Sequence, residues 1–437
     1  MFSEFKNHIN SNLPFLKKAK VLLAVSGGVD SIVLAYLCKF LGLDFAMAHC
    51  NFKLRGDESD NDEKYVFALA QKLNVEGFFQ AFDTLNYAQE NSLSTQMAAR
   101  ELRYNWFNDL SQQLEFDYIL TAHHADDNLE TFLINLSRGT GLEGLVGIPE
   151  INGNIVRPLL PFSRADIERY AVKECLGWRE DASNASVKYL RNKIRHEVVP
   201  VLKGINPQLL QNFTKTITYL KESQSIVDDR LDEVLDIVVD SVDENCISFN
   251  IKELKKLSNT KAYLYQLLKA YNFTEWDDVY SLLDAQSGKQ VFSTTHRLLK
   301  DRELLLLVDL SEESKDKILI NNIEEQLEIE NKMLSFSRVD EIDNNSQFSV
   351  FIDSDNIEFP LTLRKWQEGD YFFPFGMKGK KKLSKYFKDE KMSLVEKENV
   401  WLLCDASDAI VWLVGKRMDN RFRVKKTSKN ILNITLR

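Results

Sequence analysis

The sequence lacks several features that mark whole classes of protein. It has no run of about eighteen apolar residues, so we predict no membrane-spanning helix. It does not start with a basic and then an apolar segment, so we predict no secretion signal. Its five cysteines stand alone, without a CxxC pair: Cys38, Cys50, Cys175, Cys246 and Cys404. The odd count does not suggest a disulfide framework, these spacings cannot build a thiolate metal cluster, and the expected compartment is the cytoplasm.

Basic residues are few in most of the chain and are concentrated at its C-terminal end. The 437 residues carry a net charge of −9. Residues 360–437 contain 18 Lys and Arg against 9 Asp and Glu, so this part is at +9 and the rest is at −18. This polarity predicts that the C-terminal end contacts a polyanion such as RNA, and a solvated charged face is the alternative.

The first half of the chain alternates short apolar runs with helical patterns. The runs that we predict as strands are 21–25, 44–49, 78–82 and 117–123, and the predicted helices between and after them are 30–41, 57–73, 94–113 and 126–137. This alternation predicts an α/β fold with a parallel sheet that helices cover on both faces.

A chain of this length is too long for one core, and its patterns divide it into four parts. We predict an α/β domain over 1–205 and a helical middle domain over 206–310. An acidic linker or edge follows over 311–359, since residues 309–358 carry 14 acidic against 4 basic residues. A small, basic, mixed α/β domain is predicted over 360–437.

A glycine-rich hexapeptide lies directly between the first predicted strand and the helix that follows it. Its residues are Ser26, Gly27, Gly28, Val29, Asp30 and Ser31. Glycine lets the backbone turn sharply and approach a ligand, and the helix N-terminus supplies unpaired N–H groups and a positive dipole end. These groups and the serine hydroxyls predict a phosphate-binding loop, with a serine-capped turn as the alternative. No Gly-Lys-Ser/Thr follows, so it is not a Walker loop.

The hexapeptide resembles the pyrophosphate loop (PP-loop) of the N-type ATP pyrophosphatases. That resemblance implies that residues 26–31 bind ATP, which is cleaved between its α and β phosphates to leave a substrate adenylate and pyrophosphate. Asp30 is expected to bind Mg²⁺ as well, because carboxylates and phosphates share this hard cation. ATP and Mg²⁺ are therefore the predicted cofactors.

Polar residues follow two further predicted strands. His49 and Asn51 lie at the end of the second strand, and His123 follows a later one. The carboxyl ends of parallel strands form the ligand crevice of such folds, so we expect His49 and Asn51 to contribute to the ATP site. A single histidine at a strand end is more often structural, and this alternative stays open.

Longer segments are similar to the tRNA(Ile)-lysidine synthetase family. The matching segments are HCNFKLR (49–55), AARELRY (98–104), TAHHADDNLETFLINLSRGTGLEGLVGIP (121–149), RPLL (157–160), DASNASVKYLRNKIRHEVVP (181–200) and RKWQEGDYFFPFGMKGKKKLSKYF (364–387). The resemblance covers about residues 1–200 and 360–425. Residues between them match only in length and helical character. The resemblance implies that the middle domain over 206–310 binds substrate or tRNA and that the basic domain over 360–437 binds tRNA.

The resemblance implies a ligase that forms a carbon–nitrogen bond. This family joins L-lysine to C2 of the wobble cytidine in an isoleucine tRNA with a CAU anticodon, which changes the codon read from AUG to AUA. The cytidine is first adenylated with release of pyrophosphate, and AMP leaves when the lysine amine attacks. The implied catalytic residues are Asp30, Arg103, His123, Asp127 and Arg195, of which the two arginines could contact phosphate, lysine or tRNA.

Spacing within the fourth predicted helix agrees with a catalytic role. Asp127 and Glu130 lie three residues apart, which places both carboxylates on one helix face. Such a carboxylate could orient the lysine amine and accept its proton, and Asp127 is our first candidate. A solvated acidic face is the alternative.

The basic end interleaves lysines with aromatic residues. We predict contact with the tRNA backbone at five lysines: Lys378, Lys380, Lys381, Lys382 and Lys385. A homodimer is the oligomeric state that we expect, although no particular residue argues for it.

Two other functions stay open. A tRNA thiolation enzyme would share the loop and the adenylated base, but it needs reactive cysteines or an iron–sulfur cluster, which scattered cysteines do not favour. A non-catalytic RNA-binding protein on the same scaffold would release no pyrophosphate from ATP.

Overall fold

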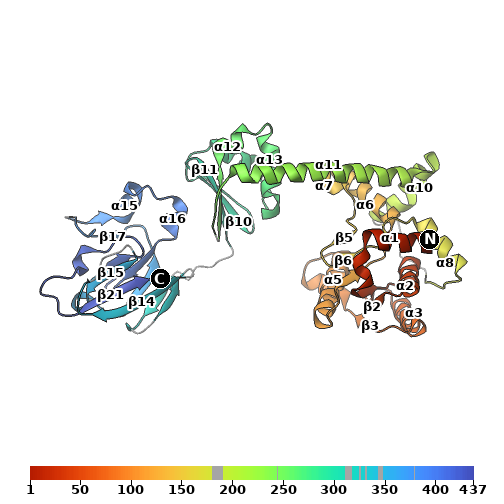
Figure 1. The fold of residues 1–437 in the computed structure, drawn as a ribbon, viewed down its shortest axis with the longest axis horizontal. Helices are drawn as coiled ribbons and strands as arrows, with labels where there is room; N and C mark the ends of the chain where they lie inside the picture. The colour runs from red at the N-terminus through yellow and green to blue at the C-terminus, as the bar shows by residue number, and fades with distance from the viewer. Residues whose placement is uncertain are drawn as a thin grey trace. The chain divides into compact units, whose positions relative to one another are not determined.

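The computed structural model describes the chain except for residues 180–189, 244, 311–316, 324–325, 330–331, 343–347 and 378. The chain forms two compact units, Met1–Asp229 and Arg230–Arg437, each with its own sheets and cores (Figure 1). No helix among the described residues is long and apolar enough to cross a membrane.

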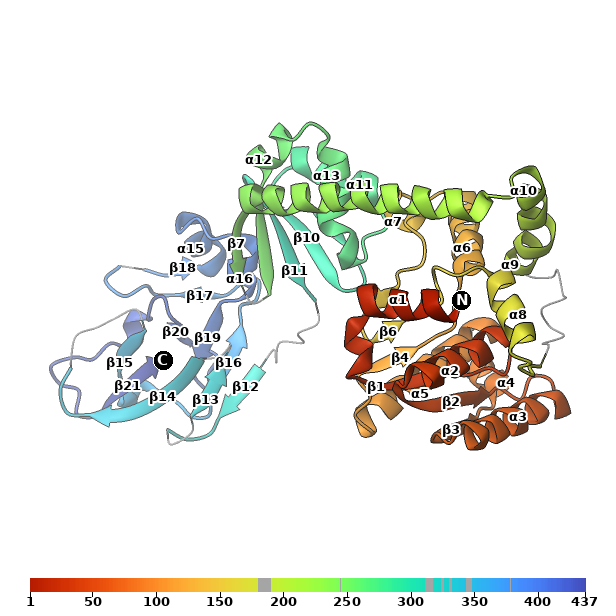
Figure 2. The ribbon, with the colours of Figure 1, turned by 45° about the vertical axis from the view of Figure 1, so that its right-hand side comes forward.

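A six-stranded sheet forms the centre of the first unit, in the order β3–β2–β1–β4–β6–β5 (Figure 2). Neighbours pair in parallel except for β5 and β6, which are antiparallel. The strands are β1 (Lys20–Ala24), β2 (Asp44–Asn51), β3 (Gly77–Ala81), β4 (Tyr118–Leu120), β5 (Ile151–Asn152) and β6 (Ile155–Val156). The parallel sheet confirms the predicted α/β class.

Alternating side chains of β1 enter cores on opposite faces of the sheet. Val21 and Leu23 belong to one core, and Leu22 packs with Phe107 and Leu110 in the other. Helices of the first core are α1 (Phe2–Asn12), α2 (Val29–Leu41), α3 (Asp57–Leu73) and α8 (Arg164–Lys173), and α5 (Thr95–Gln113) belongs to the second. Both faces are therefore covered, which is why the central strands are almost entirely apolar.

The position of β1 determines where a ligand would bind. The chain continues from β1 to β2 on one side, and β4 pairs with the other side of β1. In open α/β sheets, ligands bind at the carboxyl ends of the strands where the strand order reverses. The segments that follow β1 and β4 meet at this point.

Helices after the sheet pack on α6 (Ala125–Arg138). They are α9 (Leu190–Lys193), the π-helical turn η3 (Ile194–Val198), α10 (Val199–Ile205) and the start of α11 (Leu209–Val238). The first unit also contains two short helices elsewhere, α4 (Thr84–Glu90) and α7 (Leu142–Leu145). Leu129 of α6 shares a core with Ile194 and Val199. This core brings α9 and η3, with their arginines, against α6.

The second unit begins with an antiparallel sheet in the order β7–β8–β11–β10–β9. Its strands are β7 (Val239–Asp243), β8 (Cys246–Asn250), β9 (Gln290–Phe292), β10 (His296–Asp301) and β11 (Leu304–Asp309), and its helices are α12 (Ile251–Lys256), α13 (Thr260–Leu268) and α14 (Trp276–Ser281). Helices were predicted here and are present, but the sheet was not indicated by the sequence pattern. Its strands are three to six residues long, and periodicity does not separate runs this short from helix.

The C-terminal part contains two four-stranded antiparallel sheets around one core. The first sheet has the order β12 (Lys317–Ile320), β16 (Leu361–Lys365), β19 (Trp401–Cys404), β20 (Ile410–Leu413). The second has the order β13 (Leu327–Ile329), β14 (Lys332–Val339), β21 (Ile431–Leu436), β15 (Ser349–Asp353). The acidic segment 311–359 thus contributes the edge strands β12, β13 and β15 and the inner strand β14. A two-stranded hairpin, β17 (Tyr371–Phe372) and β18 (Lys381–Lys382), leads into α15 (Leu383–Asp389), and α16 (Leu394–Glu398) follows.

Candidate functional site

The glycine-rich loop has the geometry of an anion-binding turn. Gly27 has φ of +94°, a conformation that favours glycine, and Gly28 is the N-cap of α2. The Ser31 hydroxyl donates to the Gly28 carbonyl at 2.9 Å and accepts from the Ser26 amide at 3.2 Å. The first helical bond runs from Ile32 N–H to the Gly28 carbonyl. The amides of residues 29–31 therefore have no partner within the helix and can bind an anion.

Asp30 lies in the first turn of α2, where its carboxylate is only partly satisfied. Its Oδ2 accepts from Arg164, whereas its buried Oδ1 has no hydrogen-bond partner among the described residues. The nearest imidazole nitrogen, His124 Nε2, is 3.7 Å from Oδ1. Burial raises the pKa of Asp30 above its ordinary 3.8, and the charges of His124 and Arg164 oppose this effect.

His124 joins the loop to the first turn of α6. It is the N-cap of α6, and its side chain and that of Asp127 form a reciprocal capping box. Asp127 Oδ2 accepts from the His124 amide at 3.1 Å and lies 3.4 Å from His124 Nε2. Because that nitrogen also faces Asp30, one buried imidazole lies between the two carboxylates of the site.

Two arginines cover the carboxylates of α6. Arg195 donates from Nη2 to Asp127 Oδ1 at 2.9 Å and from Nε to Glu130 Oε1 at 2.6 Å. Arg191 donates from Nε to Glu130 Oε2 at 3.0 Å. Burial raises the pKa of Asp127, but His124 and the two arginines outweigh it and leave the pKa below 3.8. Asp127 is therefore an anion at neutral pH.

His123 lies next to this cluster but forms a different contact. Its Nδ1 is 3.0 Å from the Thr121 hydroxyl. Burial lowers the pKa of His123 to about 4, with Asp127 opposing and Arg157 assisting the shift. His123 is therefore neutral near pH 7, and it can exchange hydrogen bonds but contributes no positive charge.

The buried neutral His123 predicts a pH dependence of stability. The unfolded chain binds a proton at this histidine below about pH 6.5, whereas the folded chain does so only near pH 4. We expect the free energy of unfolding to fall by up to about 3 kcal/mol as the pH drops through this window, with no contribution from His123 above pH 7. Urea unfolding at several pH values should show a weaker dependence in His123→Asn, and an identical dependence would contradict the assignment.

Three of the predicted site residues lie outside the Asp30–Asp127 cluster: His49, Asn51 and Arg103. His49 is buried, and its Nδ1 is 2.8 Å from the Val25 carbonyl, which ties the end of β1 to β2. Asn51 is also buried and donates to Asp60 and Glu63 of α3 at 2.8 and 2.7 Å. The contact of His49 fixes the backbone directly before the loop, whereas Asn51 is bound to α3. That either residue contacts a ligand stays a prediction.

Arg103 of α5 also lies outside the cluster. Its guanidinium carbon is 5.2 Å from the ring centroid of Phe52, and its charge acts on His49 and Cys50. The structure therefore places Arg103 beside an aromatic ring at the end of β2. Such a position is suited to stacking with a base as well as to contact with phosphate.

Three residues of the site were not singled out by sequence. They are His124, Arg164 and Lys203, of which Lys203 pairs with the buried Asp126. Only His124 had a local signal, because it stands three residues before Asp127, which is the spacing of a capping box. Arg164 and Lys203 reach the site through the tertiary fold, from α8 and α10.

The predicted tRNA-binding lysines cluster around the β17–β18 hairpin of the second unit. Lys380 and Lys382 are exposed, as is Lys385 of α15. Lys381 is half-buried and forms an ion pair with Asp389 at 2.7 Å. Lys378 lies outside the described residues. Three exposed lysines on one short hairpin and its helix form a surface that can contact phosphates.

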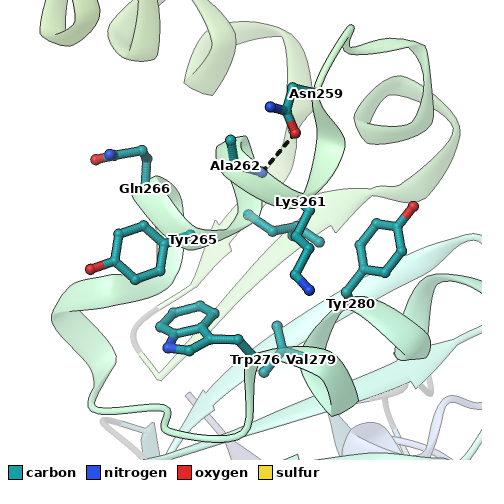
Figure 3. Close-up of a pocket in the computed structure, with 9 residues that line it drawn as sticks. Asn259, Lys261, Ala262, Tyr265, Gln266, Trp276, Val279 and Tyr280 are labelled. Atoms are coloured by element: carbon teal, nitrogen blue, oxygen red, sulfur yellow. Dashed lines mark hydrogen bonds between the residues drawn. The ribbon is translucent and has the colours of Figure 1, made fainter. Parts of the chain in front are cut away.

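A pocket of about 450 Å³ lies on the helical side of the middle region, between α13 and α14. Figure 3 shows Tyr265, Trp276 and Tyr280 around Lys261. Lys261 is paired with Asp277, and the Asn259 side chain caps α13 by accepting from the Ala262 amide at 3.3 Å. Lys261 and Asn259 thus already have partners, and the residues that line the pocket include none of the predicted site residues.

Comparison with known proteins covers the whole chain. The family model of the PP-loop domain matches residues 1–202, that of the TilS substrate binding domain matches 242–310, and that of the TilS substrate C-terminal domain matches 361–434. The tRNA(Ile)-lysidine synthase of Parabacteroides distasonis is 43% identical over 94% of this chain and 94% of its own length. The chain belongs to the tRNA(Ile)-lysidine synthase family.

Other members of the tRNA(Ile)-lysidine synthase family are similar over their full length as well. The protein from Bacteroides thetaiotaomicron is 38% identical over 96% of this chain and 95% of its own. That from Clostridium acetobutylicum is 29% identical over all of this chain and 99% of its own. The family predicted from the motifs is confirmed, and the match includes the middle region, where the sequence had suggested only similar length and helical character.

Proposed function

We propose that this chain is the ligase that joins L-lysine to C2 of the wobble cytidine in an isoleucine tRNA with a CAU anticodon, with ATP as the energy source. For a chain of the tRNA(Ile)-lysidine synthase family, one structural observation supports this proposal most strongly. The phosphate-binding loop after β1 and the Asp127–Glu130–arginine cluster after β4 meet at the point where the strand order of the sheet reverses. An activated phosphate and a second substrate can therefore be held side by side.

The first step uses the loop. The cytidine O2 attacks the α-phosphorus of ATP, and the bond to the β-phosphate breaks as pyrophosphate leaves. The free amides of residues 29–31 and the positive end of α2 stabilise the phosphate oxygens. Ser26 and Ser31 fix the loop through their hydroxyl contact at 3.3 Å, so the donors are in place before ATP binds.

The residues of the loop also fit Mg²⁺. The unpartnered oxygen of Asp30 is buried at the helix N-terminus where the phosphates would lie. Mg²⁺ with ATP usually takes one or two carboxylates and completes its shell with phosphate oxygens and water, so a single aspartate is sufficient. When bound there, the ion would neutralise charge on the departing pyrophosphate.

In the second step the lysine ε-amine attacks C2, and AMP leaves with the former O2 of the cytidine. The amine must lose a proton, since its ordinary pKa is about 10.4. Asp127 is the carboxylate that we assign to orient the amine and to accept the proton. Its low pKa makes it better at orienting the ammonium group than at storing the proton, so the proton passes on to solvent or phosphate. Arg195 and Glu130 hold Asp127 in place.

The cysteines favour this reaction over tRNA thiolation. Burial raises the pKa of Cys38, Cys50 and Cys404 to about 12, and it also raises that of Cys246. Nucleophilic sulfur chemistry needs the opposite shift. A thiolation enzyme also needs a reactive thiol or a sulfur carrier near the adenylate. Cys38 and Cys404 are buried and Cys50 and Cys246 half-buried, whereas the exposed Cys175 follows the C-terminal end of α8, whose first residue is the one that meets the loop.

The proposal includes the partners and the setting of the reaction. L-Lysine and the isoleucine tRNA are the second and third substrates, the cytoplasm is the compartment, and a homodimer remains our expectation for the oligomeric state. In a turnover assay we expect sustained release of AMP and pyrophosphate in equal amounts only when the tRNA and lysine are both present. With tRNA but no lysine, pyrophosphate release should stop once the adenylated tRNA has accumulated, and no AMP should be released. Pyrophosphate release without any dependence on tRNA would contradict the proposal.

The basic hairpin gives a second expectation. Replacing Lys380, Lys382 and Lys385 together with Gln should weaken tRNA binding by roughly tenfold or more and lower the salt dependence of log K by about 2–3, because up to three phosphate contacts are lost. Affinity for ATP should not change, since ATP binds at the loop of the first unit. Filter binding of tRNA at several salt concentrations measures both effects.

The control carries the same change of charge elsewhere. Lys6, Lys17 and Lys18 are exposed lysines of the first unit, and replacing them with Gln should leave the salt dependence close to wild type. Equal effects in both triple variants would mean that only the total charge of the chain matters.

A further inference from the structure

Arg164 occupies a position that the reaction described so far does not use. It is the first residue of α8, and its Nη1 contacts Oδ2 of Asp30 in the phosphate-binding loop. The two residues are 134 positions apart in sequence. Asp30 is also the carboxylate that we assign to Mg²⁺, so an arginine and a divalent cation would compete for the same anion.

The backbone of Arg164 is anchored to the other half of the site. Its amide donates to Oδ2 of the buried Asp126 at 2.7 Å, and Oδ1 of Asp126 pairs with Lys203. Phe162, just before α8, accepts from the Ala125 amide at 2.9 Å. The start of α8 is thus fixed to the start of α6, at the end of the sheet where the loop lies.

The end of the Arg164 side chain is much less constrained than its backbone. The side chain is 40% exposed. Its Nε donates to Glu168 at 2.7 Å, within the same helix, and Nη2 donates no hydrogen bond within the described part of the chain. A rotation of the guanidinium group therefore breaks the side-chain contact with Asp30, and with it that to Glu168, but leaves the backbone bond to Asp126 intact.

We propose that Arg164 is a further ATP-binding residue, which pairs with Asp30 in the free protein and transfers to a phosphate oxygen when Mg²⁺ and ATP bind. The proposal rests on the proposed use of ATP at this loop. Mg²⁺ at Oδ1 would weaken the attraction of the same carboxylate for Arg164 at Oδ2, and the incoming phosphates supply the anion that Arg164 then needs. The planar guanidinium group is well suited to phosphate oxygens, and Nη2 is available for a second bond.

The two roles that Arg164 could have predict effects of opposite sign. If it only blocks Asp30 in the free protein, Arg164→Gln frees the carboxylate and Mg-ATP binds more tightly. If it transfers to phosphate, Arg164→Gln loses a charged contact and raises the Kd for Mg-ATP roughly tenfold or more. The sign of the change therefore separates a phosphate ligand from a simple partner of Asp30.

The experiment is calorimetric titration of the full-length protein with Mg-ATP, and with ATP in the presence of EDTA. The wild-type affinity reports on the proposed function, whereas the ratio of variant to wild type reports on Arg164. We expect Arg164→Gln to weaken binding with and without Mg²⁺, and Arg164→Lys to retain part of the affinity because it keeps the charge. An affinity for Mg-ATP that is unchanged or higher in Arg164→Gln would overturn the proposal.

A matched control lies on the same helix. Arg169 of α8 is 75% exposed and is paired with Asp166 at 2.9 Å. Arg169→Gln removes the same charge from the same helix and should bind Mg-ATP as the wild type does. A loss in Arg169→Gln equal to that in Arg164→Gln would show a general effect of charge on α8 and would also overturn the proposal.

Discussion

Asp127→Asn should bind ATP and tRNA but form lysidine about 10²–10⁴-fold more slowly than the wild type. The substitution removes the negative charge that orients the lysine amine and keeps the size of the side chain. The single amide oxygen of asparagine can keep one of the two bonds that the carboxylate accepts, from the His124 amide at Oδ2 or from Arg195 at Oδ1, and Glu130 still holds Arg195 at 2.6 Å. The loss should therefore come from the chemistry and not from unfolding.

The step that fails can be identified by leaving lysine out. Without lysine, Asp127→Asn should still release pyrophosphate and accumulate adenylated tRNA, because the loop that binds ATP is intact. Asp166→Asn is the matched control, since Asp166 also lies in the first turn of its helix, accepts from a capping residue and pairs with an arginine. Lysidine formation near the wild-type rate in Asp127→Asn would remove this carboxylate from the mechanism.

Asp30→Asn should impair the first step, the adenylation of the cytidine with release of pyrophosphate. It loses the only carboxylate in the first turn of α2, and with it the oxygen that we assign to Mg²⁺ and the partner of Arg164. We expect release of pyrophosphate to fall at least about 10²–10³-fold, because charge on the phosphates is no longer neutralised. The measurement is a coupled pyrophosphate assay with tRNA present and a titration of Mg²⁺.

A control for helix charge accompanies this variant. Asp57 lies in the first turn of α3 and is exposed, so Asp57→Asn makes the same change at another helix start of the same domain. It should retain wild-type turnover. If Asp30→Asn retained wild-type turnover at low Mg²⁺ as well, Asp30 would have no part in binding the metal.

The parts of the site that were predictable have local patterns. The loop 26–31 stands between a strand and a helix, and Asp127 and Glu130 follow helical spacing, so each could be placed from its neighbours in sequence. Arg195 was indicated by the resemblance to the family. The structure brings Asp127, Glu130 and Arg195 together as one cluster. Their roles in catalysis stay predictions until the variants are measured.

The parts that were not predictable depend on contacts between distant segments. Nothing in the sequence near Arg164 indicates that it meets Asp30, because their contact follows from how α8 packs beside α2. Asn51 stands at a strand end, as a ligand-binding residue would, but α3 supplies the partners of its side chain. The sheet of residues 239–309 was not indicated for a similar reason, since pairing between short strands is not visible in either strand alone.

Two adjacent histidines show most clearly what could not be predicted from the sequence. His123 and His124 are identical in type, and a shift of one residue decides which faces the carboxylates. The structure places His124 between Asp30 and Asp127, while His123 contacts Thr121. Only the start of α6 at Ala125, which makes His124 the N-cap, separates the two.

The most direct test of the account is transfer of labelled lysine to tRNA. The full-length protein is incubated with Mg-ATP, labelled L-lysine and an unmodified isoleucine tRNA transcript with a CAU anticodon, and a methionine tRNA with the same anticodon is the control. The account predicts label in the isoleucine tRNA alone, located at the wobble cytidine, with one AMP released for each lysine joined. No label in either tRNA, in protein shown to bind ATP, would contradict lysidine formation and leave an ATP pyrophosphatase that acts on another acceptor.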